Sequence, residues 1–234
     1  TCVLAFSLVL GACGQTPSTD QSITSNYAHE VRPGIDILVS DSSHLIDGRR
    51  VGLITNRSGV GRGGTSSIDM LYAYPKTNLV ALFAPEHGIR GSQPEGIEIT
   101  DTVDPSTGIP IYSLYGETRF PTEKMLKGID VLAFDLQDIG TRYYTYQSTM
   151  ALAMQAAGRA KIPFIVLDRP NPIGGAVNGP TLDPAFASFV GSYPIPVRHG
   201  MTTGELAYLF TGEFNIEVDL HVVPTVGWTR DLWF

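Results

Sequence analysis

Four short, almost uninterrupted apolar runs constrain the fold of this chain more than any other feature. They cover residues 50–55, 79–83, 131–134 and 164–167. Runs of this length, bounded by polar residues, are typical of strands in a parallel sheet that is covered on both faces. Amphipathic segments lie between them. Strands that alternate with helices predict an α/β fold with a doubly wound, mostly parallel sheet.

The helical segments carry recognisable end signals. Thr65 or Ser66 can cap the first of them, with Asp69 in its first turn. Gly128 follows the second segment at the position where a left-handed backbone favours glycine. A pair of threonines precedes the last segment and can cap it. We therefore predict helices over residues 66–74, 121–126, 148–160 and 203–210.

Each predicted strand is followed directly by polar or charged residues. In doubly wound sheets ligands bind outside the carboxyl ends of the strands, so four such ends converging on one edge predict a site. One motif alone would be read as a turn or a helix cap. The four strand ends are Thr55-Asn56-Arg57, Pro85-Glu86-His87-Gly88, Asp135-Leu136-Gln137-Asp138 and Asp168-Arg169-Pro170-Asn171-Pro172.

Glu86 is the predicted general acid. It follows an apolar strand, where low-dielectric surroundings raise the pKa of a carboxyl and keep it protonated near neutral pH. Glycoside hydrolysis needs such a donor for the leaving oxygen. The alternative is a structural ion pair between Glu86 and Arg90.

A second carboxylate is expected after the third strand, from Asp135 or Asp138. Asp138 lies in the loop and is freer to reach a cleft, so we favour it. Asp135 and Gln137 share one face of the strand because side chains alternate. Either aspartate could instead cap the following turn.

Aromatic and cationic groups near this edge suit a carbohydrate. Residues 140–146 combine Arg142 with three tyrosines, whose rings stack on sugars and whose hydroxyls bind sugar oxygens. Arg169, Arg198 and His199 offer positive charge that could hold the lactyl carboxylate of muramic acid. Ordinary packing and surface ion pairs are the structural alternatives.

The glycine-rich loop, residues 59–64, matches the G-x-G-x-x-G pattern and makes a nicotinamide-dependent oxidoreductase the best rival function. Three residues separate these glycines from the strand, whereas the fingerprint turns directly at the strand end. The five histidines show no metal-ligand spacing. We therefore expect neither an organic cofactor nor a metal.

The N-terminus predicts export. An apolar run over residues 3–10 is too short to span a bilayer and fits the core of a signal peptide. It leads into Leu10-Gly11-Ala12-Cys13, which resembles the lipobox of bacterial lipoproteins and predicts lipidation of Cys13. A polar stretch follows, as expected of a flexible tether. The alternative is a buried N-terminal strand.

The charge distribution argues against nucleic acid as a partner. The net charge of −7 is spread along the chain without a basic block. A nucleic-acid binder needs a face dense in Lys and Arg to displace counterions from phosphates.

Five motifs together resemble the exo-β-N-acetylmuramidases, once catalogued only as a domain of unknown function. The resemblance covers roughly residues 34–234. It lies in residues 83–91 around Pro85-Glu86-His87, in 135–146, in 168–175, in Arg198-His199-Gly200-Met201-Thr202-Thr203-Gly204-Glu205 and in Gly227-Trp228-Thr229-Arg230.

That resemblance implies a Rossmann-like domain joined to a smaller C-terminal domain, with the active cleft between them. It implies release of MurNAc from the non-reducing end of peptidoglycan-derived saccharides such as MurNAc-GlcNAc, without metal or organic cofactor. It nominates Glu86 as the catalytic carboxylate. The residues expected to line the sugar subsite are Asn56, His87, Arg90, Gln137, Arg142, Tyr144, Arg169, Asn171 and His199.

We accordingly expect four segments: a signal peptide and lipobox (1–13), a tether (14–33), a Rossmann-like catalytic domain (34–214) and the beginning of a truncated C-terminal domain (215–234). The expected protein is a glycoside hydrolase of the bacterial cell envelope, anchored to a membrane through Cys13. A non-catalytic muropeptide-binding lipoprotein is the further alternative.

Overall fold

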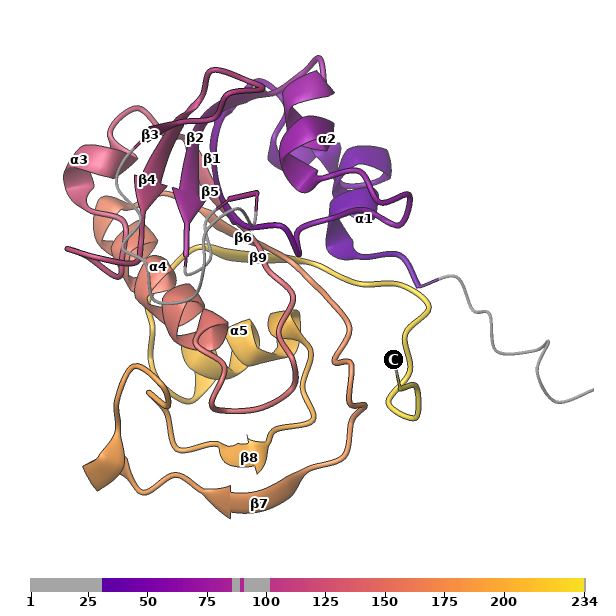
Figure 1. Cartoon of the computed structure of the whole chain (residues 1–234), viewed down its shortest axis with the longest axis vertical. Helices are drawn as coiled ribbons and strands as arrows, with labels where there is room; N and C mark the ends of the chain where they lie inside the picture. Colours follow the sequence, from indigo (N-terminus) through magenta and orange to yellow (C-terminus); the bar gives the residue numbers. More distant parts are fainter. Residues whose placement is uncertain (1–30, 86–88, 91–101, 234) are drawn as a thin grey trace, which may run out of the picture.

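The computed structural model describes residues 31–85, 89–90 and 102–233. Its centre is a seven-stranded sheet in the order β3-β4-β2-β1-β5-β6-β9 (Figure 1). The four predicted strands are β1 (Arg50–Thr55), β2 (Asn78–Ala84), β5 (Val131–Asp135) and β6 (Phe164–Leu167). The predicted α/β sheet is thus confirmed, and the observed bounds differ from the expected ones by at most one residue.

Three further strands extend this sheet on its two sides. β4 (Pro110–Ser113) pairs in parallel with β2, and β9 (Leu220–Val223) pairs in parallel with β6. The two-residue strand β3 (Thr102–Val103) runs antiparallel to β4. Numbering only the parallel strands along the chain gives the order 3-2-1-4-5-6, which is that of Rossmann folds. The order of the strands reverses between β1 and β5, so the ligand crevice of such a fold lies at their carboxyl ends.

Helices cover both faces of the sheet. α1 (Gly34–Ser40) and α2 (Ser67–Ala73) lie on one face, with a short 3-10 turn (Ser43–Leu45). α3 (Glu123–Leu126), α4 (Tyr146–Ala160) and α5 (Thr203–Gly212) lie on the other (Figure 1). Alternation along β1 explains the two layers, because Leu53 packs with the α1 and α2 side whereas Ile54 packs with the α4 side.

The predicted helix signals work as expected. The Ser66 hydroxyl accepts a hydrogen bond from Asp69 N at 3.1 Å, which caps α2. Thr202 and Glu205 form a reciprocal capping box at α5. Gly128 has a φ of +86° just beyond α3, which a side chain would strain. α4 begins two residues earlier than predicted.

The expected boundary at residue 214 differs from the structure. β9 lies within the segment 215–234, yet it forms the sixth parallel strand of the main sheet through its pairing with β6. Its sequence, Leu220-His221-Val222-Val223, interrupts the apolar residues with a histidine and was not predicted as a strand. Because β9 forms the last parallel strand beside β6, the Rossmann-like unit extends at least to Val223.

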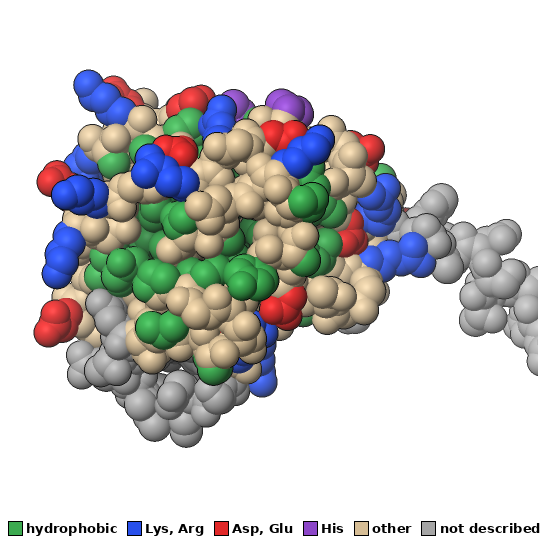
Figure 2. Space-filling view, turned by 90° about the horizontal axis from the view of Figure 1, so that it is seen from above, with side chains coloured by type: hydrophobic (Ala, Val, Ile, Leu, Met, Phe, Trp, Pro, Cys, Tyr) green, Lys and Arg blue, Asp and Glu red, His purple; other side chains and the backbone are tan. Residues whose placement is uncertain are grey.

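A small second sheet lies below the main one in Figure 1. It consists of β7 (Asn178–Thr181) and β8 (Pro196–Arg198), which are antiparallel, with a 3-10 turn (Pro184–Phe186) between them. Figure 2 shows Lys and Arg side chains interspersed with Asp and Glu around one face of the molecule. Among the described residues, no helix has the length and apolar character needed to cross a membrane.

Candidate active site

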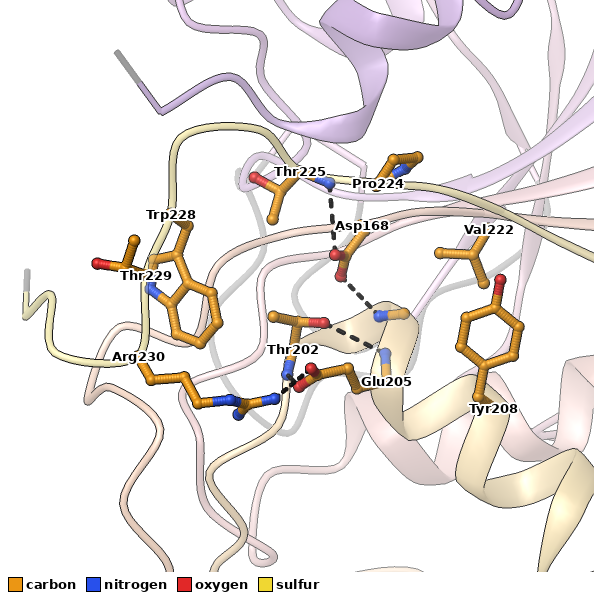
Figure 3. Close-up of a pocket in the computed structure, with 11 residues that line it drawn as sticks. Asp168, Thr202, Glu205, Tyr208, Val222, Pro224, Thr225, Trp228, Thr229 and Arg230 are labelled. Atoms are coloured by element: carbon orange, nitrogen blue, oxygen red, sulfur yellow. Dashed lines mark hydrogen bonds and ion pairs between the residues drawn. The ribbon is translucent and has the colours of Figure 1, made fainter. Parts of the chain in front are cut away.

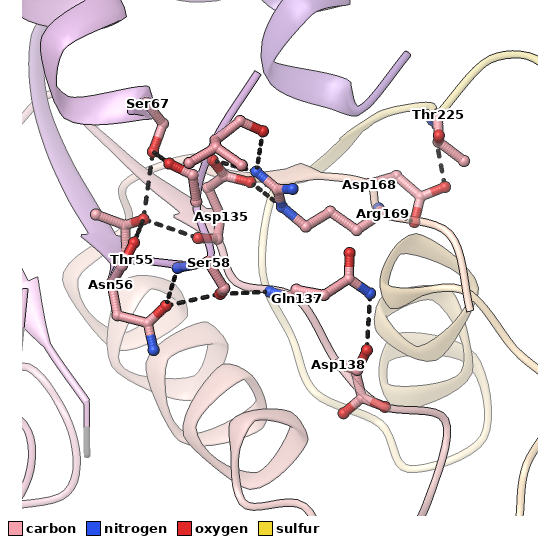
Figure 4. Close-up of polar contacts among 12 residues, drawn as sticks. Thr55, Asn56, Ser58, Ser67, Asp135, Gln137, Asp138, Asp168, Arg169 and Thr225 are labelled. Atoms are coloured by element: carbon pink, nitrogen blue, oxygen red, sulfur yellow. Dashed lines mark hydrogen bonds and ion pairs between the residues drawn. The ribbon is translucent and has the colours of Figure 1, made fainter. Parts of the chain in front are cut away.

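A continuous network of hydrogen bonds joins the carboxyl ends of β1 and β5, where the strand order reverses (Figure 4). The Ser58 hydroxyl donates to Asn56 Oδ1 at 2.6 Å and accepts from Gln137 N at 3.1 Å. Asn56 is buried, and its amide also donates to the Tyr146 hydroxyl. Sequence analysis predicted Asn56 and Gln137 at this edge but missed Ser58, which connects them.

The glycine-rich loop closes against the end of β1 without making the turn of a dinucleotide fingerprint. Val60 and Ser66 form a β-bridge, so the glycines sit in a small hairpin before α2. A side chain at Gly59 would come within 2.1 Å of Thr55 Oγ1. Gly59 therefore serves close packing at the edge, whereas Gly63 and Gly64 have open space around them, and the helix that follows the loop begins only at Ser67.

A buried ion pair joins β5 to the loop after β6. Arg169 Nε lies 2.6 Å from Asp135 Oδ1 and its Nη2 lies 3.0 Å from Oδ2, so the contact is bidentate. Nη2 also donates to Val60 O at 2.9 Å. The Asp135 side chain is 0% exposed and that of Arg169 is 5% exposed. Arg169, expected to contact sugar, thus fastens three segments of the edge together.

Asp138, the expected second carboxylate, is also buried. Its Oδ1 accepts from Gly140 N at 2.6 Å and lies 3.3 Å from His199 Nε2. Its Oδ2 is buried and has no hydrogen-bond partner within the described part of the chain. His199 Nδ1 accepts a hydrogen bond from Met201 N at 3.2 Å. A neutral His199 therefore carries its proton on Nε2, which donates a hydrogen bond to Asp138 Oδ1. The two residues tie the loop after β5 to the segment before α5.

Three other predicted residues hold backbone groups. Gln137 Nε2 donates to Pro170 O at 2.8 Å, and Asn171 Nδ2 donates to Met201 O at 3.0 Å. Arg142 Nη1 donates to two carbonyls, Pro180 O at 2.8 Å and Ile195 O at 2.7 Å, at the second sheet. Tyr144 packs edge-on against Tyr146, with ring centroids 4.5 Å apart. Sugar contact by these residues stays a prediction.

Arg90 lies between two carboxylates. Its Nε is 2.8 Å from Asp104 Oδ1, and its Nη2 is 3.1 Å from Asp69 Oδ1 on α2. The hydrogen bonds from Arg90 lower the pKa of both aspartates below its usual value, with the Thr107 hydroxyl assisting at Asp104. Asp104 is fully buried. Arg90, whose side chain is 33% exposed, therefore bridges α2 and the turn that follows β3.

Glu86 and His87 lie outside the described residues. Their described neighbours are Pro85, directly after β2, and Ile89, and both are buried. β2 pairs in parallel with β1, so its carboxyl end belongs to the same edge as the network of Figure 4.

Asp168, named above in the fourth strand end but not among the expected site residues, is a further carboxylate at this edge. Its Oδ1 accepts from Gly204 N at 2.6 Å and from Arg169 N at 2.9 Å, and its Oδ2 from Thr225 N at 3.4 Å. Burial raises the pKa of Asp168, and these donors oppose the rise. Its position directly after β6 was the signal that could have found it.

Fold and edge together define a Rossmann-like α/β domain whose polar residues gather where this fold binds ligands. Among the described residues, no three His, Cys, Asp or Glu side chains are placed to hold a metal ion. Residues 51–234 match the family model described as exo-beta-N-acetylmuramidase NamZ, N-terminal, and the chain belongs to that family.

Known proteins similar to this chain agree with the family. A Bacillus subtilis (strain 168) protein named peptidoglycan beta-N-acetylmuramidase NamZ is 50% identical over 235 residues, covering 100% of this chain and 56% of that protein. Two solved structures of DUF1343 family proteins from Bacteroides fragilis NCTC 9343 are also similar. One is 48% identical with a TM-score of 0.80, and the match covers 87% of this chain and 52% of that protein's chain. The other is 36% identical with a TM-score of 0.76, and the match covers 88% of this chain and 54% of that protein's chain. The chain thus spans about half the length of these relatives.

Proposed function

We propose that this chain is the Rossmann-like part of an exo-acting glycoside hydrolase that releases N-acetylmuramic acid from the non-reducing end of peptidoglycan fragments. One observation carries the proposal: the 50% identity to the peptidoglycan beta-N-acetylmuramidase of B. subtilis extends over the whole chain. The polar carboxyl edge of a Rossmann-like sheet supports it, because that is where a ligand is expected.

Glu86 supplies the proton in this proposal. Hydrolysis breaks the bond between the anomeric carbon and the glycosidic oxygen, which leaves with a proton from the general acid. Water supplies the new hydroxyl at the anomeric carbon and gives one proton to a carboxylate of the site. The buried neighbours Pro85 and Ile89 support a carboxyl that is partly desolvated and so stays protonated near neutral pH.

The Glu86→Gln variant tests this role. It keeps the shape and polarity of the side chain but removes the transferable proton, so release of MurNAc from MurNAc-GlcNAc should fall about 10²–10⁴-fold. Substrate affinity and melting temperature should change little. A lowered melting temperature with near-normal turnover per folded molecule would make Glu86 structural instead.

Asp138 is the second carboxylate in this proposal, and its burial sets the design of the test. Asp138→Asn keeps the bond from Gly140 N but removes the charge beside His199. Loss of turnover at an unchanged melting temperature supports a role in the chemistry. Loss of both would assign Asp138 to holding the loop after β5.

A muropeptide-binding protein without catalysis is the alternative, and wild-type turnover decides it. Incubation of the whole protein with MurNAc-GlcNAc should yield free MurNAc. Binding without product would favour the binder.

We further propose that the protein is exported and anchored in the bacterial cell envelope through Cys13. The sequence Leu10-Gly11-Ala12-Cys13 after an apolar run supports this. Mass spectrometry of protein from its native membrane should show an acylated N-terminal cysteine, and Cys13→Ser should release the protein from the membrane fraction. An unmodified chain that still carries residues 3–10 would contradict the proposal.

A further inference from the structure

A cavity of about 450 Å³ opens beside the candidate active site, at the carboxyl ends of β6 and β9 and the beginning of α5 (Figure 3). Of the groups described in the candidate active site, Asp168 lines it, together with its backbone donors Gly204 and Thr225. Its size lies within the range of about 300–1,000 Å³ that is usual for small-molecule sites. Asp168 lies at its base, and Trp228 and Tyr208 stand on either side.

The wall chemistry suits a sugar ring. Two aromatic side chains offer apolar faces to the C–H groups of a pyranose, and the Tyr208 hydroxyl can bond a sugar oxygen. Asp168 adds a carboxylate acceptor. Among the described residues, one backbone donor reaches its Oδ2, Thr225 N at a long 3.4 Å, and the Thr202 side chain also hydrogen-bonds to this carboxylate. A carboxylate oxygen in this position can accept a further bond from a ligand hydroxyl.

The beginning of α5 does not make this an anion site. Its amide groups are already bonded, since Gly204 N donates to Asp168 Oδ1 at 2.6 Å and Glu205 N donates to Thr202 Oγ1 at 3.2 Å. A phosphate or carboxylate would therefore not find these two amides open, although free helix ends usually attract anions.

The charges of the lining also disfavour an anion. Among the described residues that line the cavity, Asp168 and Glu205 are acidic and Arg230 is the one basic residue. Arg230 is held by Glu205 through Nη2 and by Gly200 O through Nη1 at 2.7 Å. The net charge of the lining is therefore −1, which repels the lactyl carboxylate of muramic acid.

We propose that this cavity is a saccharide subsite for a neutral N-acetylhexosamine, such as the N-acetylglucosamine residue of a peptidoglycan fragment. This rests on the proposed function only for the identity of the sugar. MurNAc, the sugar of the disaccharide that carries the lactyl group, then binds outside this cavity.

The test measures binding of methyl β-N-acetylglucosaminide to the whole protein carrying Glu86→Gln, so that binding is measured without hydrolysis. We expect saturable binding that shifts the indole N–H resonance of Trp228, which is assigned with Trp228→Phe. N-acetylmuramic acid, which carries the carboxylate, should shift this resonance at least tenfold less effectively. Glucosamine, whose amine is positively charged, tests whether the cavity selects a cation. Tighter binding of this amine than of the neutral sugar would overturn the proposal in favour of a cation site.

A matched pair of exposed tyrosines separates pocket from fold. Tyr208 is 57% exposed on α5 and lines the cavity, whereas Tyr72 is 55% exposed on α2 and does not. Tyr208→Ala should weaken binding of the glycoside about tenfold, and raise KM for MurNAc-GlcNAc with kcat nearly unchanged. Tyr72→Ala should change neither, and both variants should melt at the wild-type temperature.

The outcomes also distinguish this inference from the proposed function. If the wild-type protein releases no MurNAc while the glycoside still binds with the expected Tyr208 dependence, the subsite stands and the hydrolase does not. If MurNAc is released but Tyr208→Ala behaves as Tyr72→Ala does, the subsite is refuted. Absence of glycoside binding, as expected if the rest of the protein fills the cavity, refutes it as well.

Discussion

The ion pair between Arg169 and Asp135 should be a main determinant of stability, and replacing Arg169 by Met tests this. The substitution keeps an apolar stem but removes the guanidinium. Asp135 would then remain as a charge in a position that is 0% exposed, with no cationic partner. Removing one member of a buried pair costs about 3–5 kcal/mol, because the remaining charge is neither solvated nor compensated.

This free energy translates into a large thermal shift. A change of 1 kcal/mol moves the melting temperature of a domain of this size by about 2–4 °C, so Arg169→Met should melt about 6–20 °C below wild type. The assay is thermal unfolding followed by circular dichroism at neutral pH. A second variant, Asp135→Asn with Arg169→Met, removes both charges and should be more stable than Arg169→Met alone.

An exposed pair supplies the control. Arg50 and Asp130 also form a bidentate contact, but their side chains are 52% and 38% exposed. Arg50→Met makes the same chemical change where water screens the charges, so its melting temperature should stay close to wild type. The reasoning from burial would be wrong if Arg169→Met melted like Arg50→Met. It would also be wrong if the double variant lost as much stability as Arg169→Met and Asp135→Asn lose together. A change confined to substrate affinity would support the sugar-binding role that the sequence predicts for Arg169.

Three more predictions follow from the same structure. Arg90 lowers the pKa of Asp69 and Asp104, whose stabilising effect is complete above their ordinary pKa of 3.8 and is lost as the pH falls through the lowered values. Arg90→Met should therefore flatten the fall in melting temperature between about pH 5 and pH 2, and an unchanged profile would contradict this. Thr202→Ala removes the cap of α5 and should cost about 0.5–2 kcal/mol in urea unfolding, whereas Thr211→Ala near the other end of that helix should be close to neutral. Calorimetric titration of the whole protein with NAD and NADP should show no micromolar binding (about −8 kcal/mol), because the glycine-rich loop packs against β1 instead of turning directly into a helix.

The sequence by itself determined the elements whose signals are local. Continuous apolar runs identified β1, β2, β5 and β6, because strands buried on both faces have no polar alternation. Cap residues placed the beginnings of α2 and α5 for the same local reason. The edge of the sheet that gathers polar residues also followed from the sequence, since parallel strands end on one side.

Strands whose identity depends on a neighbour were not predicted. β9 is four residues long and partly polar, and it is a strand because β6 offers it an unpaired edge. That pairing moved the end of the Rossmann-like unit past the expected boundary at residue 214. Residues 220–223 by themselves do not indicate that this segment pairs with β6.

Only the tertiary structure decided what each polar side chain at the edge contacts. Arg169 and Asp135 are 34 residues apart, and His199 and Asp138 are 61 apart, yet each pair lies within 3.3 Å. Composition and spacing showed that charged groups would meet at this edge, but burial and distance determine which of them neutralise one another. Asp168, Tyr208 and Trp228 come from three separate segments, and they line one cavity only because β6, α5 and the segment after β9 converge there.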